Sequence, residues 1–203
     1  MAGGREGLIC AILAGGRSLR MGRPKGMIAV GGRPLIARIA AQARCLTDRI
    51  FVCGNAGPDA AEIGLPAISD VYEGRGPLAG LHAALLHDPS SSVLLLACDL
   101  PNVHSAMLER LVALADGYDI AAACTSDGIP QPLCAFYRRT CMHAVENCLK
   151  NGVNRAMALL SDRSLRVRLV GPEAGNFTDS DLLNLNTPDD LKKLSERSSD
   201  THI

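Results

Sequence analysis

A glycine-rich, basic segment follows directly on the first apolar run of the sequence. Residues 8–12 read LICAI, and residues 13–25 read LAGGRSLRMGRPK. Gly15 and Gly16 can adopt backbone angles that are closed to other residues, and without side chains they let main-chain N–H groups approach an anion closely. Arginines and Lys25 then add positive charge. The segment predicts a loop that leaves a buried strand and wraps phosphates.

The two best-known phosphate loops do not fit this segment. A Walker A loop needs a lysine directly after its last glycine, whereas Gly22 is followed by Arg23 and Pro24. A dinucleotide-binding fingerprint needs G-x-G-x-x-G, and here the first two glycines are adjacent. The alternative without a ligand is an ordinary strand-to-loop turn with solvated arginines.

Asp99 is the second residue with the chemistry for a phosphate site. It ends the apolar run of residues 93–98, and Pro101 fixes the turn that follows. A carboxylate at the end of a buried strand suits Mg²⁺, a hard cation that prefers carboxylate and phosphate oxygens and keeps several waters. Aspartate is also common in turns and as the cap of a helix, which is the structural alternative here.

The elements that would position these residues alternate along the chain. Apolar runs predict strands at 8–13, 49–53, 92–97, 118–123, 132–137 and 165–170. Helical spacing predicts helices near 34–46, 77–87, 104–115, 139–150 and 188–197. This order predicts an α/β fold with a mostly parallel, doubly wound, Rossmann-like sheet flanked by helices. In such sheets ligands gather outside the carboxyl ends of the strands, where the glycine loop and Asp99 would lie.

Composition is that of a compact enzyme domain. With 203 residues, 47% of them apolar and 21% charged, residues 1–203 are expected to form a single domain with loose tails at 1–7 and 196–203. Lys plus Arg and Asp plus Glu number 21 each, so no global basic field attracts nucleic acid or an anionic membrane. No apolar run approaches the length of a membrane span, and the first residues lack the features of a signal peptide, so we expect a cytoplasmic protein.

The eight cysteines form no C-x-x-C pair and are interpreted as reduced packing residues.

Residues 13–25 resemble the signature LAGG-x-S-x-RMG-x-x-K of the nucleotidyltransferases that activate sugars, isoprenoid precursors and molybdopterin. Further stretches are similar to one family of that superfamily, the molybdenum cofactor guanylyltransferases. They are GPLAG at 76–80, CDLP at 98–101, PQPL at 130–133 and NLNTPDDL at 184–191, in the family's order. The resemblance implies a fold of the nucleotide-diphospho-sugar transferase type.

The resemblance also implies roles for individual residues. Lys25 corresponds to the family's phosphate-binding lysine, Asp99 to the aspartate that binds the metal, and Arg20 lies in the R-M-G element, so these three are the candidate catalytic residues. Asn55 stands two residues after Cys53, near the place of a nucleotide-binding asparagine. The residues expected at the nucleotide are Leu13, Ala14, Gly15, Gly16, Lys25, Asn55, Asp70, Gly76, Pro77, Leu78, Gly80, Asn184 and Asn186.

Several of these assignments have a structural alternative. Asp70 is either a reader of guanine, whose N1–H and amino group are both donors, or a turn residue. Residues 76–80 either line the nucleotide or simply start a helix. Asn184 and Asn186 alternate with leucines and would share one side of an extended segment, approaching the metal or a phosphate, whereas residues 187–190 also form an N-cap pattern.

The function implied by the resemblance is transfer of GMP from GTP to the terminal phosphate of molybdopterin or the molybdenum cofactor, with Mg²⁺ and release of pyrophosphate. GTP and the pterin would be the small-molecule partners, with transient contacts to cofactor-synthesis or acceptor enzymes, and neither nucleic acid nor membrane. Residues 130–133 would help to form the pterin pocket, with Gln131 where the family often has histidine.

Three other functions stay open at this point. A cytidylyltransferase making the cytosine dinucleotide would share nearly every motif, although the Asn-x-Asn-Thr-Pro element favours guanine. A sugar-1-phosphate nucleotidyltransferase shares the first motif but usually has a longer acceptor region. A noncatalytic module that binds molybdopterin would retain the fold, but it would not require both Lys25 and Asp99.

Overall fold

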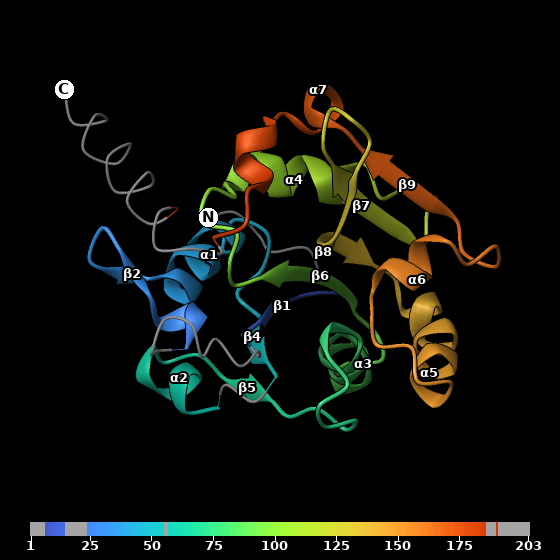
Figure 1. The fold of residues 1–203 in the computed structure, drawn as a ribbon, viewed down its shortest axis with the longest axis horizontal. Helices are drawn as coiled ribbons and strands as arrows, with labels where there is room; N and C mark the ends of the chain where they lie inside the picture. The colour runs from blue at the N-terminus through green and yellow to red at the C-terminus, as the bar shows by residue number, and fades with distance from the viewer. Residues whose placement is uncertain (1–6, 15–23, 55–56, 186–189, 191–203) are drawn as a thin grey trace.

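The computed structural model describes residues 7–14, 24–54, 57–185 and 190. Within these residues, seven strands form one sheet in the order β5-β4-β1-β6-β8-β7-β9, and β2 and β3 form a separate antiparallel pair (Figure 1). The strands are β1 (Leu8–Leu13), β2 (Ala29–Val30), β3 (Arg33–Pro34), β4 (Ile50–Cys53), β5 (Ala67–Ile68), β6 (Ser92–Ala97), β7 (Ile120–Cys124), β8 (Pro130–Tyr137) and β9 (Val167–Val170). The α-helices are α1 (Leu35–Ala43), α2 (Gly57–Glu62), α3 (Pro77–His87), α4 (Ser105–Ala113), α5 (Met142–Lys150), α6 (Met157–Leu160) and α7 (Pro172–Gly175). Three 3-10 turns are η1 (Lys25–Met27), η2 (Arg139–Cys141) and η3 (Asp179–Leu182).

The sheet is mostly parallel, as predicted. Strands β5, β4, β1 and β6 run parallel to one another, and β9 runs parallel to β7. Strand β8 lies antiparallel to both β6 and β7 and joins the two parallel parts. The α/β fold with flanking helices is therefore confirmed, with one reversed strand inside the sheet.

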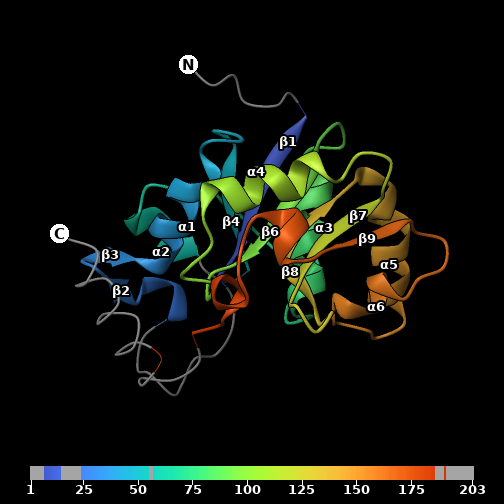
Figure 2. The ribbon, with the colours of Figure 1, turned by 90° about the horizontal axis from the view of Figure 1, so that it is seen from above.

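Helices cover both faces of this sheet (Figures 1 and 2). On one face α1 and α4 pack with alternate residues of the strands, among them Cys10, Ile12 and Leu94. On the other face α3, α5 and α6 pack against the intervening residues, such as Ile9 and Leu95. Because successive strand residues point to opposite faces, a strand between two helical layers must be apolar throughout. This explains the unbroken apolar runs of β1 and β6.

The cysteines pack in these cores. Burial raises the pKa of the Cys53 and Cys134 thiols to about 12, so both are protonated at neutral pH. The buried members are Cys10, Cys53, Cys98, Cys124, Cys134 and Cys141. Their interpretation as packing residues is confirmed.

Most predicted elements are present, and the differences have local causes. The five helices expected from spacing include α1, α3 and α4, while the expected helix over 139–150 begins with the 3-10 turn η2. Of the helix expected over 188–197, the structure describes residue 190 alone, which is helical. The tail expected at 196–203 and residues 1–6 of the tail expected at 1–7 lie outside the described residues. The Gly7 carbonyl accepts a hydrogen bond from the Ser92 N–H at 2.7 Å. Sequence periodicity missed the short elements α2, β5, α6, α7 and η3, because two to six residues are too few to establish a period. No helix in the described ranges is long and apolar enough to cross a membrane.

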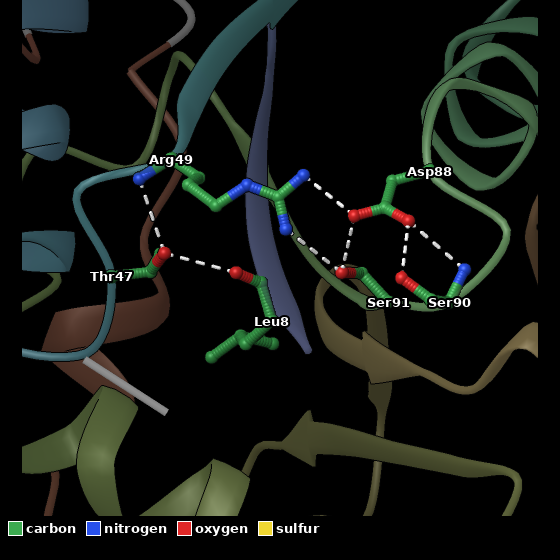
Figure 3. A network of polar contacts seen from close by, with 6 residues as sticks. All are labelled: Leu8, Thr47, Arg49, Asp88, Ser90 and Ser91. Carbon is green, nitrogen blue, oxygen red and sulfur yellow. Dashed lines mark hydrogen bonds and ion pairs between the residues drawn. The ribbon is translucent and has the colours of Figure 1, made fainter. Parts of the chain in front are cut away.

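The amino ends of the central strands are held by a polar network (Figure 3). Thr47 Oγ1 donates to the Leu8 carbonyl at 2.9 Å and accepts from the Arg49 N–H at 3.1 Å. The Arg49 guanidinium binds Asp88 Oδ2 at 2.6 Å and Ser91 Oγ at 3.0 Å. Ser90 and Ser91 donate to the same carboxylate. The network joins the residues that precede β4 and β6 to the start of β1, at the edge of the sheet opposite the carboxyl ends.

This network predicts a pH-dependent contribution to stability. Hydrogen bonds from Ser90 and Ser91, together with Arg49, hold the pKa of Asp88 well below its usual range. A carboxyl group whose pKa is lower in the folded state stabilises the fold at pH values above its pKa in the unfolded chain, which is about 3.9 for aspartate. This contribution is lost as the pH falls through the pKa of the group in the folded state. We therefore expect the urea midpoint of Asp88→Asn to lie below that of the wild type by a constant amount above about pH 5, and by a shrinking amount below about pH 4. A difference that widened on acidification would contradict this role.

Candidate active site

The register of the parallel strands brings four chain segments to one edge of the sheet. Leu13 at the end of β1 lies opposite Cys53 of β4 and Ala97 of β6, and Cys53 lies opposite Ile68 of β5. The segments that follow these four residues therefore leave the sheet side by side. They begin with Ala14, Gly54, Ser69-Asp70 and Cys98-Asp99. In Figure 2, β1 descends from the top of the view, so this edge faces downward.

Lys25 and Asp99 meet at this edge. Lys25 Nζ lies 2.7 Å from Asp99 Oδ2, and the two side chains are 19% and 22% exposed. The other carboxylate oxygen, Asp99 Oδ1, is buried and has no hydrogen-bond partner among the described residues. The two residues singled out for phosphate and metal chemistry, 74 positions apart in the sequence, thus form one contact.

The backbone of Lys25 is fixed by a tight turn against the core. Lys25 begins η1, and its carbonyl accepts from the Ile28 N–H at 3.2 Å. Gly26 is buried against the side chain of Ile36 in α1, so closely that a β-carbon on Gly26 would lie 2.5 Å from Ile36 Cγ1. Only glycine lets this turn approach the helix, and the approach places the lysine stem at the sheet edge.

The backbone of Asp99 is fixed from two sides. The Cys98 N–H donates to the Leu13 carbonyl at 3.0 Å, which continues the pairing of β6 with β1 by one residue. The Asp99 carbonyl accepts from the Leu185 N–H at 2.8 Å, and Leu185 itself is buried against Val30 and Leu35. Leu185, near the end of the described chain, therefore anchors the backbone of Asp99.

Asp70 lies beside the loop that follows β4. Burial raises the pKa of its carboxyl group, an effect opposed by a hydrogen bond from the Gly54 backbone and reinforced by Glu73. Asp70 Oδ1 is buried and has no partner among the described residues. A β-carbon on Gly80 would lie 3.9 Å from that oxygen and would overlap the Leu13 side chain. Three predicted nucleotide residues, Leu13, Asp70 and Gly80, are thus brought together.

The residues around the start of α3 divide into backbone and core positions. Gly76 has φ +65°, a conformation that favours glycine, and caps α3, with Pro77 in the first turn. The Leu78 side chain is fully buried in the core, so it serves in packing. Only the backbone of Leu78 could contribute to a site at the start of α3. Sequence reasoning could not separate these two kinds of position within one motif.

Some predicted site residues lie outside the described part of the chain. These are Gly15, Gly16, Arg20, Asn55 and Asn186. Asn184 is described and exposed, next to the Leu185 that binds Asp99. Its neighbour Leu183 is 58% exposed whereas Leu185 is 2% exposed, so the two leucines do not share a buried face.

Beside the four segments, the start of β8 and the turn η3 also lie at the carboxyl edge of the sheet. Strand β8 runs antiparallel, so its first residues, Pro130 and Gln131, lie opposite Cys124 and Ala123 at the carboxyl end of β7. Asp179 of η3 accepts from the backbone and hydroxyl of Ser126. Asn102 donates to the Ser180 carbonyl at 2.9 Å.

Sequence reasoning missed these contacts of η3. The hydrogen bond from Ser126 to Asp179 spans 53 positions of the sequence, and the one from Asn102 to Ser180 spans 78. Sequence reasoning also missed Asp59 of α2. Burial raises the pKa of the Cys98 thiol, the charges of Asp99 and Asp59 raise it further, and Lys25 opposes them.

A divalent cation fits the donor set at Asp99. No group of three or more His, Cys, Asp or Glu side chains able to hold a metal occurs among the residues that the structure describes. Mg²⁺ does not need such a cage, because one or two carboxylates together with substrate phosphates and water complete its shell. Asp99 Oδ1, which is buried and has no hydrogen-bond partner in the part of the chain that the structure describes, is a carboxylate oxygen of this kind.

Comparison with known proteins agrees with this geometry. The family model of the MobA-like NTP transferase domain matches residues 10–167, which include the four segments at the carboxyl edge. The chain belongs to the MobA-like NTP transferase family. The resemblance inferred from the sequence is confirmed, and the chain is accordingly a nucleotidyltransferase.

Relatives in this family cover almost the whole chain. A Pelotomaculum thermopropionicum protein named "Probable molybdenum cofactor guanylyltransferase" is 32% identical over 185 residues, which are 90% of this chain and 89% of that protein. The molybdenum cofactor guanylyltransferase of Desulfosudis oleivorans is 29% identical over 187 residues, 90% of this chain and 91% of that protein. Among solved structures, molybdopterin-guanine dinucleotide biosynthesis protein A from Archaeoglobus fulgidus has a TM-score of 0.78 and 26% identity, covering 95% of this chain and 99% of that one. This structural match confirms the predicted fold type.

The packing of Gly26 against Ile36 yields a prediction. We expect Gly26→Ala to lower the free energy of unfolding by about 1–3 kcal/mol, because the added methyl overpacks the contact with α1. It should also weaken nucleotide binding, since η1 carries Lys25. Urea denaturation and nucleotide titration measure the two effects. In the double variant with Ile36→Ala the new methyl gains room, so the stability losses should be less than additive. Additive losses would show that the contact does not position η1.

Proposed function

We propose that this chain transfers GMP from GTP to the terminal phosphate of molybdopterin or the molybdenum cofactor, giving the guanine dinucleotide form and pyrophosphate. The observation that carries the proposal is the contact of Lys25 Nζ with Asp99 Oδ2 at 2.7 Å. It lies at the carboxyl edge of the sheet, where β1 ends and the chain continues into the glycine-rich segment. The guanylyltransferases among its relatives support the choice of GTP and of the acceptor.

The chemistry asks the protein for charge neutralisation and alignment. An oxygen of the acceptor phosphate attacks the α-phosphorus of GTP and forms a new P–O bond. The bond from the α-phosphorus to the bridging oxygen breaks, and its electron pair leaves with pyrophosphate. The attacking phosphate is already an anion, so no strong general base is needed. Positioned cations and backbone amides would supply the stabilisation of the transition state.

Individual residues have distinct parts in this reaction. Lys25 would bind the triphosphate and offset charge that develops on the leaving pyrophosphate. Asp99 would hold Mg²⁺, which when bound neutralises phosphate charge and orients the triphosphate. Arg20, Gly15 and Gly16, whose placement is not described, would add charge and backbone N–H groups around the phosphates.

The nucleoside would lie between the segments after β4 and β5. Asp70 Oδ1, buried and unpartnered in the described part of the chain, is an acceptor suited to the N1–H and amino donors of guanine. Gly80, Leu13, Ala14 and the backbone of residues 76–78 would border the same space. Asn55, Asn184 and Asn186 stay predictions as nucleotide contacts.

The pterin would lie on the side of β8. Pro130 and Gln131 at its start are half-buried at the carboxyl edge, beside the segment held by Ser126 and Asp179. A cytoplasmic location and transient contacts with cofactor-synthesis or acceptor enzymes also stay predictions.

The first test is pyrophosphate release by the purified chain with Mg²⁺ and molybdopterin, comparing GTP, CTP and ATP. We expect release with GTP. Asp99→Ala should abolish it, and Lys25→Ala should reduce the rate on the order of 10²-fold, the scale for losing one transition-state charge contact. Lys150→Ala, which removes an exposed lysine of α5 paired with Glu146, is the control and should keep the wild-type rate.

The outcomes of this assay separate the competing functions. Preference for CTP would keep the mechanism and change the product to the cytosine dinucleotide. No release with any nucleotide, from folded protein and competent molybdopterin, would favour the noncatalytic module. Wild-type rates in Asp99→Ala or Lys25→Ala would defeat the assignment of these residues.

Asp70 gives a separate prediction about base recognition. We expect Asp70→Ala to raise the KM for GTP about tenfold or more, because a buried acceptor for the guanine donors is lost. Inosine triphosphate lacks the 2-amino group, so the wild type should prefer GTP to it and Asp70→Ala should lose that preference. Glu62→Ala, which removes an exposed acidic residue of α2, is the control. An unchanged preference in Asp70→Ala would assign guanine recognition elsewhere.

A further inference from the structure

The contact between Lys25 and Asp99 has a consequence for the order of ligand binding. The ammonium of Lys25 lies 2.7 Å from the carboxylate that would hold the metal. An ion pair at this distance already balances the single negative charge of Asp99. The second oxygen, Oδ1, is buried and has no hydrogen-bond partner within the described ranges. It shares the negative charge of the carboxylate, which the ammonium of Lys25 already balances.

The backbone on both sides of the contact is anchored. Lys25 begins a turn that packs Gly26 against Ile36, and Asp99 is tied through its carbonyl to Leu185. Neither backbone needs to move to separate the charges. The four-carbon stem of Lys25 is flexible, so its side chain can swing from Asp99 to another anion while the aspartate stays in place.

Electrostatics decides which ligand can separate them. A dication on Asp99 would stand close to the ammonium and be repelled by it, because like charges at a few ångströms in a half-buried site interact strongly. A triphosphate instead offers Lys25 anionic oxygens that carry more charge than one carboxylate. Transfer of Lys25 to the phosphates would leave Asp99 as an uncompensated anion, and a metal would then bind it.

We propose that Lys25 withholds Asp99 from divalent metal until a nucleoside triphosphate takes the lysine away, so that metal and nucleotide bind cooperatively. The proposal rests on the proposed function for the identity of the two ligands. Coupling of this kind is reciprocal, since each ligand raises the affinity of the other by the same factor. It would keep the chain from binding metal without a substrate.

The test is binding of Mn²⁺ alone, without nucleotide or acceptor, followed by the electron paramagnetic resonance signal of the free ion. We expect the wild-type chain to bind Mn²⁺ weakly and Lys25→Gln to bind it about tenfold or more tightly, within the usual range of coupling between sites. The gain should vanish in Lys25→Gln/Asp99→Asn, because the freed carboxylate is then gone. Lys25→Arg, which keeps the charge, should stay weak.

Matched controls make the result decisive. Lys150→Gln also removes one lysine that pairs with a carboxylate, at 3.3 Å from Glu146, and should leave Mn²⁺ affinity unchanged. Asp59, whose negative charge also raises the pKa of the Cys98 thiol, is retained in every variant. A gain in Mn²⁺ affinity that disappears in Lys25→Gln/Asp99→Asn therefore cannot come from Asp59. Far-UV circular dichroism establishes that each variant is folded, and Lys25→Met carries the same expectation as Lys25→Gln.

Each outcome bears on the proposal. Mn²⁺ affinity in Lys25→Gln and Lys25→Met no higher than in the wild type overturns it, and so does a gain that persists when Asp99 is replaced. Tighter binding that requires Asp99 supports it. The assay contains no nucleotide and no pterin, so a chain that proved to use CTP, or another acceptor, would give the same Mn²⁺ result and fail only in pyrophosphate release.

Discussion

The pairing of β1 with a parallel strand on each side is the constraint on which the rest of the structure depends. Leu13 is in register with both Cys53 and Ala97, so the chain leaves three neighbouring strands at one level. Hydrogen bonds from Ala14 to Cys53 and from Cys98 to Leu13 extend that register by one residue. A shift of one position would turn every strand residue to the opposite core, so the two packed faces lock the register. The position of Asp99 follows from this packing.

Charge at the edge is arranged by the same scaffold. Lys25 comes from a turn packed on α1, and Asp99 comes from the end of β6, yet their side chains meet. Both are about one-fifth exposed, so water weakens their attraction only in part and a highly charged ligand can still compete for the lysine. In the proposed site, this cation and this carboxylate are paired with each other and would be available separately to a triphosphate and a metal. Under the two proposals, catalysis and ligand order would depend on the same two residues.

Agreement between sequence and structure was best where a long apolar run met a single residue of distinct chemistry. Asp99 after β6 and Gly76-Pro77 at the start of α3 are such places, because an unbroken apolar run and a Gly-Pro helix start are local sequence signals. Agreement was poorer within short segments. Leu78 lies in a nucleotide motif but packs in the core. Its core neighbours include residues distant in sequence, such as Leu149 and Leu159, so the motif alone could not show which way this side chain points.

The sequence by itself determined the α/β fold and the strand that precedes the glycine-rich segment, and it predicted Lys25 and Asp99 as the residues for phosphate and metal. Periodicity and residue chemistry carry that information, since they act over a few positions of the chain. Tertiary structure alone decided that β8 runs antiparallel, that Leu185 holds the Asp99 carbonyl, and that Lys25 rests on Asp99 at 2.7 Å. These contacts join residues many tens of positions apart, and packing of both faces of the sheet fixes them where no local pattern can.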